Sequence, residues 1–309
     1  MGYEYGIVRG MSEVSVNPRT GLREEWDPFF QVPRVQQRSL GALRFEGQLT
    51  AVHAVPLGRG LTLDWYARLG RGDELFVTFQ GAASREKNIY PMFTRVSSMR
   101  GKAKAFMSFA DPTLLVDHSR EMLLSWHLGG PGWDPIPAVL RVIRRAQRKT
   151  GARHIAFLGG SGGGYAALRA SAAVPGSMAF VQEPQTTIAK YLPPVVARYF
   201  DTVWGDWDAQ KLMEAFPERF DMVRHYAAAR PENFVYYVQS RADSPHVENH
   251  YAPFRELHGV TTDSGVSRGG NRHFVLYDGE VPGHGKITAG EFDRFFQQAV
   301  AAWRASRGK

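Results

Sequence analysis

The sequence predicts an α/β protein in which helices cover both faces of a mostly parallel sheet, giving three layers. Six short runs rich in Phe, Val, Ile and Tyr recur along the chain, and the segments between them are long enough for crossover helices. Strands that are apolar along their whole length are buried on both sides, as in parallel sheets. The predicted strands are residues 74–82, 104–111, 154–159, 177–183, 233–240 and 273–279.

The N-terminal part of the chain has a different pattern. Residues 1–66 contain short alternating runs, such as GALRFEGQLTAVHAV and LTLDWYARL, which Gly and Pro interrupt. This pattern predicts strands and hairpins, either as a small subdomain or as the first strands of the larger sheet. We therefore divide the chain into a β-rich segment, residues 1–66, and an α/β domain, residues 67–309.

Composition limits the class of protein. A chain of 309 residues with 43% hydrophobic and 22% charged residues can bury one large core. It contains no cysteine, which excludes disulfides, thiolate catalysis and cysteine-ligated metal sites. No apolar run approaches the roughly 18 residues of a membrane span, and the N-terminus lacks the pattern of a signal peptide. We expect a cytoplasmic protein with no membrane partner.

The net charge of +8 raises the question of a nucleic-acid partner, and the densest basic cluster is RVIRRAQRKTGAR, residues 141–153. Apolar residues recur at helical spacing through the same region, so the arginines form the solvated side of an amphipathic helix. No signature of a nucleic-acid-binding fold accompanies the cluster. We expect no nucleic-acid partner, although an anionic substrate fits the charge.

The interval of residues 184–231 is longer than a crossover connection requires. Its proline and aromatic content predicts several short helices rather than one long one. Because it follows a predicted strand of the sheet, we expect it to form a helical lid over the strand ends.

The stretch that points to a catalytic function is HIAFLGGSGGGYAALRASA, residues 154–172. Gly159, Ser161 and Gly163 satisfy the pattern G-x-S-x-G between an apolar strand and a helix-forming run. A serine on so sharp a turn has a strained backbone, and the flanking glycines leave space for close backbone approach. This context predicts that Ser161 is a nucleophile at the N-terminus of a helix.

Two other interpretations of the glycine loop stay open. In a shifted register the loop also fits the dinucleotide-binding pattern G-x-G-x-x-A, with Gly162, Gly164 and Ala167, and Glu183 lies at the end of the next strand. The protein would then be a Rossmann-type oxidoreductase that binds NAD(P). Against this, at least two strands precede the loop, whereas the dinucleotide pattern usually follows the first strand. The loop could also be a turn without chemistry.

A nucleophilic serine needs a base and an acid that orients the base. Asp243 follows the predicted strand 233–240, and His284 follows the predicted strand 273–279 in EVPGHGKIT. Glu183 is the reserve acid, and Asp243 could instead cap the helix that follows it. His246 and His250 follow Asp243 at helical spacing and could form a metal site with it, but no further ligand is evident.

The order of Ser161, Asp243 and His284 relative to the strands resembles that of the α/β-hydrolase superfamily over about residues 67–309. A weaker resemblance, carried by FADPTL at 109–114, LSWHLGG at 124–130 and EPQTTI at 183–188, is to hydrolase-fold proteins of bacterial surface-polysaccharide and accessory-secretion systems. Some proteins of this second group acetylate sugars.

The resemblance implies a Ser-His-Asp triad and an acyl-enzyme intermediate, with no cofactor and no metal. The oxyanion donors would be the amide of Gly162 and a loop amide near Gly81, Ala82 and Ala83. The expected substrate is a small-molecule or glycan ester, and the enzyme would be an esterase or an O-acyltransferase. A non-catalytic binding protein on the same fold is the remaining alternative, and the sequence does not specify the oligomeric state.

Overall fold

The computed structural model describes residues 14–45, 50–83 and 89–308, and its centre is one sheet of twelve strands. The spatial order of the strands is β1-β2-β3-β4-β5-β7-β6-β8-β9-β10-β12-β11. Their bounds are β1 Ser15–Val16, β2 Arg23–Asp27, β3 Val32–Gln36, β4 Thr50–Gly58, β5 Leu61–Leu69, β6 Glu74–Phe79, β7 Ala105–Phe109, β8 His154–Gly160, β9 Met178–Gln182, β10 Phe234–Ser240, β11 Gly265–Val266 and β12 Arg272–Tyr277.

The six strands predicted from apolar runs are β6, β7, β8, β9, β10 and β12, and they pair in parallel as a continuous block. Within this block β7, β8, β9 and β10 are nearly or completely buried along their length, as the unbroken apolar pattern indicates. Parallel strands end at the same edge of the sheet, so the loops after them are brought together.

The N-terminal strands belong to the same sheet. β4 and β5 form a long antiparallel pair, and β5 also pairs antiparallel with β7. β5 runs from Leu61 to Leu69 and therefore crosses the limit of 66 and 67 set from the sequence. Residues 14–45 and 50–66 therefore fit the second of the two alternatives, because they supply the first strands of the larger sheet. Residues 1–13 and 46–49 lie outside the described part. The two-part domain division stays a prediction.

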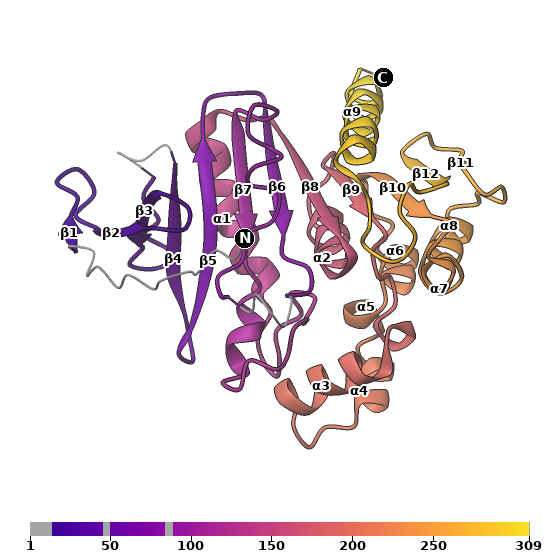
Figure 1. Ribbon diagram of the computed structural model, residues 1–309, viewed down its shortest axis with the longest axis horizontal. Helices are drawn as coiled ribbons and strands as arrows, with labels where there is room; N and C mark the ends of the chain where they lie inside the picture. Colours follow the sequence, from indigo (N-terminus) through magenta and orange to yellow (C-terminus); the bar gives the residue numbers. More distant parts are fainter. Residues whose placement is uncertain (1–13, 46–49, 84–88, 309) are drawn as a thin grey trace, which may run out of the picture.

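Helices lie on both faces of the sheet (Figure 1). Val139 of α1 and Leu168 of α2 pack in a core on one face, whereas Phe292 and Phe296 of α9 pack in a core on the other. The mixed α/β arrangement predicted from the sequence is therefore present. The helices are α1 Pro135–Thr150, α2 Ser161–Ala172, α3 Pro193–Val203, α4 Ala209–Ala215, α5 Pro217–Phe220, α6 Met222–Ala229, α7 Ser244–His246, α8 Ala252–Leu257 and α9 Ala289–Ser306, with a π-helix at Val247–Tyr251 and 3₁₀ turns at Pro112–Val116 and Ile188–Lys190.

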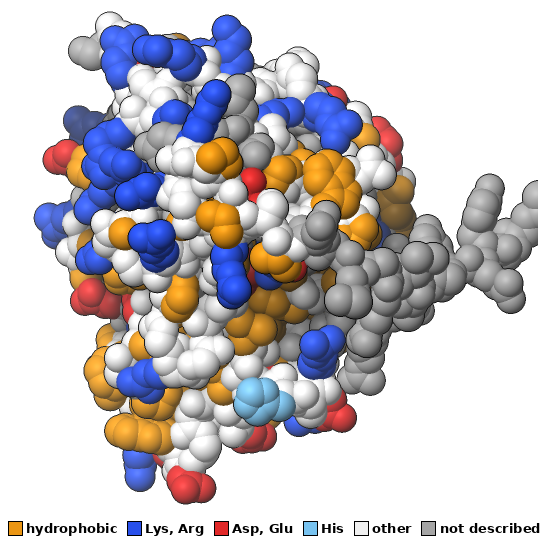
Figure 2. Space-filling view, turned by 90° about the vertical axis from the view of Figure 1, so that its left-hand side faces the viewer, with side chains coloured by type: hydrophobic (Ala, Val, Ile, Leu, Met, Phe, Trp, Pro, Cys, Tyr) orange, Lys and Arg blue, Asp and Glu red, His pale blue; other side chains and the backbone are white. Residues whose placement is uncertain are grey.

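Helix α1 shows how the basic cluster is accommodated. Asp134 caps its N-terminus by accepting a hydrogen bond from the amide of Ile136, and Gly151 ends it in the left-handed conformation. Val139 and Ile143 are buried, while the arginines of the predicted polar side are mostly exposed. Figure 2 shows that Lys and Arg also outnumber acidic side chains on the face formed by the N-terminal strands.

The interval predicted as several short helices contains α3, α4, α5 and α6. Helices α3 and α4 gather at the lower edge of the view in Figure 1. Among the helices of the described residues, none combines the length and apolar character needed to cross a membrane.

Candidate active site

Ser161 is the first residue of α2, directly after β8, and its φ of 53° is in the left-handed region. Non-glycine residues adopt this conformation rarely, so the turn is strained. A Cβ on Gly159 would lie 2.1 Å from the carbonyl oxygen of Gly163, and one on Gly163 would lie 2.5 Å from the carbonyl oxygen of Phe79. The flanking glycines are therefore required by close backbone contacts, as the sequence pattern predicts.

The structure brings the three predicted triad side chains into one line. His284 lies in the loop between β12 and α9, and its Nε2 is 2.8 Å from Ser161 Oγ. His284 Nδ1 is 2.8 Å from Oδ2 of Asp243, which directly precedes α7 in the loop after β10. Both distances are those of good hydrogen bonds. A neutral imidazole that donates from Nδ1 to the carboxylate has Nε2 free to accept the serine proton.

Asp243 is shared by two imidazoles. His246 Nδ1 lies 3.2 Å from its Oδ1, and the rings of His246 and His284 stack with centroids 3.9 Å apart. Burial raises the pKa of Asp243, but the hydrogen bonds with His246 and His284 outweigh burial and hold the pKa well below its usual range. The carboxylate therefore stays ionised. Burial lowers the pKa of His246, so this second imidazole is neutral at pH 7.

Gln185 connects the second imidazole to the serine. Trp126 Nε1 donates to Gln185 Oε1 at 3.2 Å, which orients the amide because an indole nitrogen can only donate. The Nε2 group of Gln185 then donates to Ser161 Oγ at 2.9 Å and to His246 Nε2 at 3.1 Å. These bonds close a ring around the site. In order, the ring runs through Ser161, His284, Asp243, His246 and Gln185.

Glu183, the reserve acid, has a different set of contacts. Its Oε2 accepts a hydrogen bond from the amide of Gly285 at 2.5 Å and lies 3.8 Å from His284 Nδ1. Burial raises the pKa of Glu183, partly offset by that backbone hydrogen bond. Asp243, at 2.8 Å, is the nearer of these two carboxylates to His284 Nδ1.

The structure changes the set of residues that could bind a metal: His284, rather than His250, lies beside Asp243 and His246. Asp243, His246 and His284 each offer a ligand atom, and these atoms lie within 4.8 Å of one another. An ion held there would replace the hydrogen bonds between Asp243 and the two imidazoles. His250 faces elsewhere, since its Nδ1 lies 3.3 Å from the amide of Thr186, and burial lowers its pKa to about 3.

Backbone amides for an oxyanion come from two segments. Gly162 lies in the first turn of α2, where an amide has no acceptor within the helix. The amide of Ala83 is already used, because it donates to the carbonyl of Leu123 at 2.8 Å. Within the described residues, no hydrogen bond uses the amide of Gly81 or Ala82, and both residues line the same cavity as Ser161. Residues 84–88 of this loop lie outside the described part.

The three short segments that carry the weaker resemblance, residues 109–114, 124–130 and 183–188, contact one another next to the site. Asp111 accepts hydrogen bonds from Ser125 Oγ at 2.8 Å and from the amide of His127 at 2.6 Å. This contact fixes FADPTL against LSWHLGG. The next contact, from Trp126 to Gln185, joins LSWHLGG to EPQTTI.

One cavity lies at the serine turn, and a second lies on the far side of Leu124. The first, called here the catalytic pocket, has a volume of about 330 Å³ and is lined by Gly81, Ala82, Ser161 and His284 among others. The second, called the outer cavity, has a volume of about 550 Å³. Its lining residues are Arg120, Glu121, Met122, Leu123, Leu124, Pro194, Val195 and Arg198.

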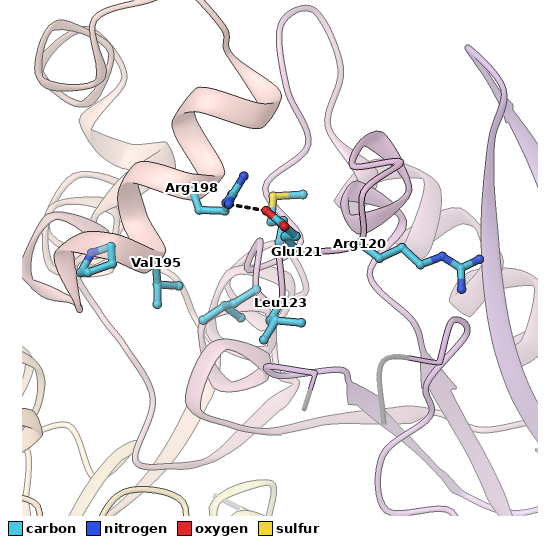
Figure 3. Close-up of a pocket in the computed structure, with 8 residues that line it drawn as sticks. Arg120, Glu121, Leu123, Val195 and Arg198 are labelled. Carbon is cyan, nitrogen blue, oxygen red and sulfur yellow. Dashed lines mark hydrogen bonds and ion pairs between the residues drawn. The ribbon is translucent and has the colours of Figure 1, made fainter. Parts of the chain in front are cut away.

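The outer cavity lies between α3 and the loop before Ser125 (Figure 3). Leu123 and Val195 contribute apolar side chains, and Arg198 forms an ion pair with Glu121 at 2.5 Å. Leu124 separates this cavity from the serine turn, because a Cβ on Gly162 would lie 2.3 Å from Leu124 Cδ1. The segment 184–231 therefore supplies one wall of a hollow beside the site.

Sequence reasoning found neither Trp126 nor Gln185, and it gave His246 no place beside the triad. The first two lie inside strings that were noted only for their resemblance. His246 was considered as a metal ligand, and its spacing of three residues from Asp243 was the available signal.

A scan against protein-family models finds no match, and neither does a search of curated proteins. Solved structures do match. The capsule O-acetyltransferase of Neisseria meningitidis serogroup A has a TM-score of 0.59 at 12% identity, and the match covers 84% of this chain and 99% of that one. Its H228A mutant in complex with CoA also has a TM-score of 0.59 at 12% identity, covering 80% and 94% of the two chains.

The carboxyl esterase 2 of the mycorrhizal fungus Tuber melanosporum has a TM-score of 0.50 at 13% identity, covering 87% of this chain and 90% of that chain. At these identities the similarity establishes the fold alone: the chain shares the α/β arrangement of these hydrolase-fold structures, as predicted, whereas the helical lid and the N-terminal extension stay predictions. Both kinds of protein named by the resemblances, esterases and a surface-polysaccharide enzyme, occur among the structural neighbours.

Proposed function

We propose that the protein is a serine acyl-transfer enzyme in which Ser161 is the nucleophile, His284 the base and Asp243 the orienting acid. The observation that carries this proposal is the unbroken line of hydrogen bonds from Ser161 Oγ through His284 to Asp243, with both distances 2.8 Å. This geometry is what removal of a serine proton requires, since nucleophile, base and orienting carboxylate are in direct contact.

In the first half of the reaction, Ser161 Oγ forms a bond to the ester carbonyl carbon while its proton passes to His284 Nε2. The tetrahedral intermediate collapses, the bond to the alcohol oxygen breaks, and the proton on His284 passes to the departing alcohol. In the second half an acceptor hydroxyl gives its proton to His284 and attacks the carbonyl carbon of the acyl-enzyme. The bond between that carbon and Ser161 Oγ then breaks, and the proton on His284 returns to Ser161 Oγ. Asp243 stays ionised throughout and holds the imidazole in the required tautomer.

The oxyanion of each tetrahedral intermediate would be stabilised by backbone amides. The amide of Gly162 is one donor, and Gly81 or Ala82 supplies the other, because the amide of Ala83 is occupied. Such donors are fixed before the reaction begins, so they stabilise the developing charge without reorganisation.

The acceptor decides whether the enzyme is an esterase or an O-acyltransferase. We propose a glycan ester as substrate or product, since the capsule O-acetyltransferase matches over nearly its whole length. The outer cavity, which both apolar and charged residues line, is a suitable place for part of such a substrate, and segment 184–231 would act as its lid.

The test is a comparison of donors and acceptors with purified protein. 4-Nitrophenyl acetate and acetyl-CoA are supplied as acyl donors, with and without a mixture of oligosaccharides, and products are detected by mass spectrometry. The proposal is supported if Ser161→Ala abolishes consumption of the donor and the control variant Ser97→Ala, at an exposed serine, retains it. Acetylated oligosaccharide assigns O-acyl transfer, and free acetate alone assigns hydrolysis. Equal donor consumption by Ser161→Ala and wild type would refute the proposed nucleophile.

A further inference from the structure

The catalytic pocket contains a cation that the proposed mechanism does not use. Arg95 lines this pocket together with Ser161 and His284, although it comes from the loop between β6 and β7. Its φ of 62° is in the left-handed region, so the chain holds Arg95 in a conformation that non-glycine residues rarely adopt. Strained residues of this kind concentrate at functional sites.

The contacts of Arg95 hold its guanidinium without neutralising it. Arg95 Nη2 donates to Oε1 of Gln182 at 2.9 Å, and the guanidinium carbon lies 4.0 Å from the ring centroid of Phe292. No described acidic side chain forms an ion pair with Arg95. Asp293, whose charge raises the pKa of Arg95, is already paired with Lys102 at 3.1 Å.

The guanidinium is also close to the serine turn. Gln182, at the end of β9, is aligned with Gly160, at the end of β8. A Cβ on Gly160 would lie 3.9 Å from Gln182 Oε1, the same atom that accepts the hydrogen bond from Arg95. The side chain of Gln182 therefore lies between the guanidinium and the residue before Ser161, and Arg95 and Ser161 line the same cavity.

Burial lowers the pKa of Arg95, because the charged form bears a desolvation cost in the pocket. A partly buried guanidinium stacked on an aromatic ring, with one neutral hydrogen-bond partner, retains donors for a planar or tetrahedral anion. Carboxylates and phosphates accept such donors in pairs, and the resulting hydrogen bonds are stronger than those between neutral groups.

We infer that Arg95 forms an anion subsite of the catalytic pocket and selects ester substrates that carry a carboxylate or a phosphate next to the reacting ester. This inference rests on the proposed function, because it assigns substrate selection to the same pocket. The subsite is separate from the triad: Arg95 binds the anionic group and leaves proton transfer to His284.

The alternative is that Arg95 has only a structural role, in which its contacts hold Gln182 and Phe292 in place. Loss of such a structural contact lowers activity on all substrates to the same degree. Loss of an anion subsite lowers it selectively for charged substrates, so the ratio of kcat/KM between matched charged and neutral esters separates the two roles.

The experiment measures this ratio for two substrate pairs. 4-Acetoxybenzoate and 4-acetoxybenzamide differ by a charge on the alcohol side, and mono-4-nitrophenyl succinate and 4-nitrophenyl butyrate differ by a charge on the acyl side. The variants are Arg95→Gln, which removes the charge, Arg95→Lys, which keeps it, and the control Arg100→Gln, an exposed arginine of the same loop. Binding of inorganic phosphate is measured in parallel by calorimetry.

We expect Arg95→Gln to lower the charged-to-neutral ratio about 10- to 100-fold in one pair, as loss of a charge-assisted hydrogen bond implies. The affected pair tells whether the anion belongs to the acyl group or to the alcohol. Arg95→Lys should keep part of the preference, Arg100→Gln should keep all of it, and phosphate should bind wild type more tightly than Arg95→Gln.

A ratio that Arg95→Gln leaves unchanged in both pairs would overturn the inference. If wild type hydrolyses none of the four esters, the proposed hydrolytic activity on simple esters fails, and phosphate binding decides the subsite by itself. Equal phosphate affinity in wild type and Arg95→Gln would then reject the subsite.

Discussion

Replacement of Gln185 by Met tests whether the hydrogen-bond ring operates as a unit. The methionine side chain has a similar length but cannot donate or accept as an amide does. Trp126 Nε1 and His246 Nε2 would each lose a partner, and both residues are buried, at 0% and 6% exposure. A buried polar group left without a partner costs about 1–3 kcal/mol, so we expect the free energy of unfolding to fall by about 2–6 kcal/mol.

The same variant also loses the hydrogen bond to Ser161 Oγ. The hydroxyl then loses the donor that directs its proton towards His284, and we expect kcat on 4-nitrophenyl acetate to fall about 10-fold, the equivalent of one hydrogen bond. Urea unfolding and steady-state kinetics give both quantities. Gln210→Met is the matched control, because Gln210 is exposed on α4 and, among the described residues, its side chain forms a hydrogen bond with Glu214 alone, at 2.9 Å. Equal free energies of unfolding for the two variants would refute the proposal that the ring of hydrogen bonds stabilises the fold.

Three further predictions follow from the same geometry. Gly163→Ala should destabilise the fold by about 1–3 kcal/mol or prevent folding, because its Cβ would lie 2.5 Å from Phe79 O; thermal unfolding checks this, and a wild-type Tm would contradict it. The low pKa of Asp243 in the folded state stabilises the protein above the ordinary value near pH 4, and this contribution is lost as pH falls further. The stability difference between wild type and Asp243→Asn should therefore shrink below about pH 4 in urea titrations, and a difference independent of pH would exclude this linkage. EDTA should leave the ester hydrolysis rate unchanged, and a loss that Zn²⁺ restores would favour a metal at Asp243, His246 and His284.

Local patterns predicted the parts of the fold that local physics determines. The strand before Ser161 is apolar along its length and the glycines after it permit close approach, so β8, the turn and α2 could be derived from residues 154–172. The chain order of Asp243 and His284 after two further strands then placed both at the same sheet edge. These signals need no knowledge of contacts between distant segments.

The parts that sequence reasoning missed depend on such contacts. Gln185 matters because Trp126, 59 residues earlier, fixes its orientation, and nothing in EPQTTI shows that partner. Arg95 reaches the pocket from a loop that lies 87 residues before its partner Gln182. Similarly, the alternating pattern of residues 61–69 predicts a strand but does not reveal that β5 pairs with β7 and joins the two parts of the sheet.

The most direct test of the central claim is the intact mass of the protein after exposure to a fluorophosphonate probe. Such probes react with a serine whose proton is removed by a neighbouring base, and they require no knowledge of the substrate. We predict one adduct on wild type and none on Ser161→Ala or His284→Ala. A folded wild-type protein that forms no adduct, or an adduct that persists in Ser161→Ala, would contradict the assignment of Ser161 as the activated nucleophile.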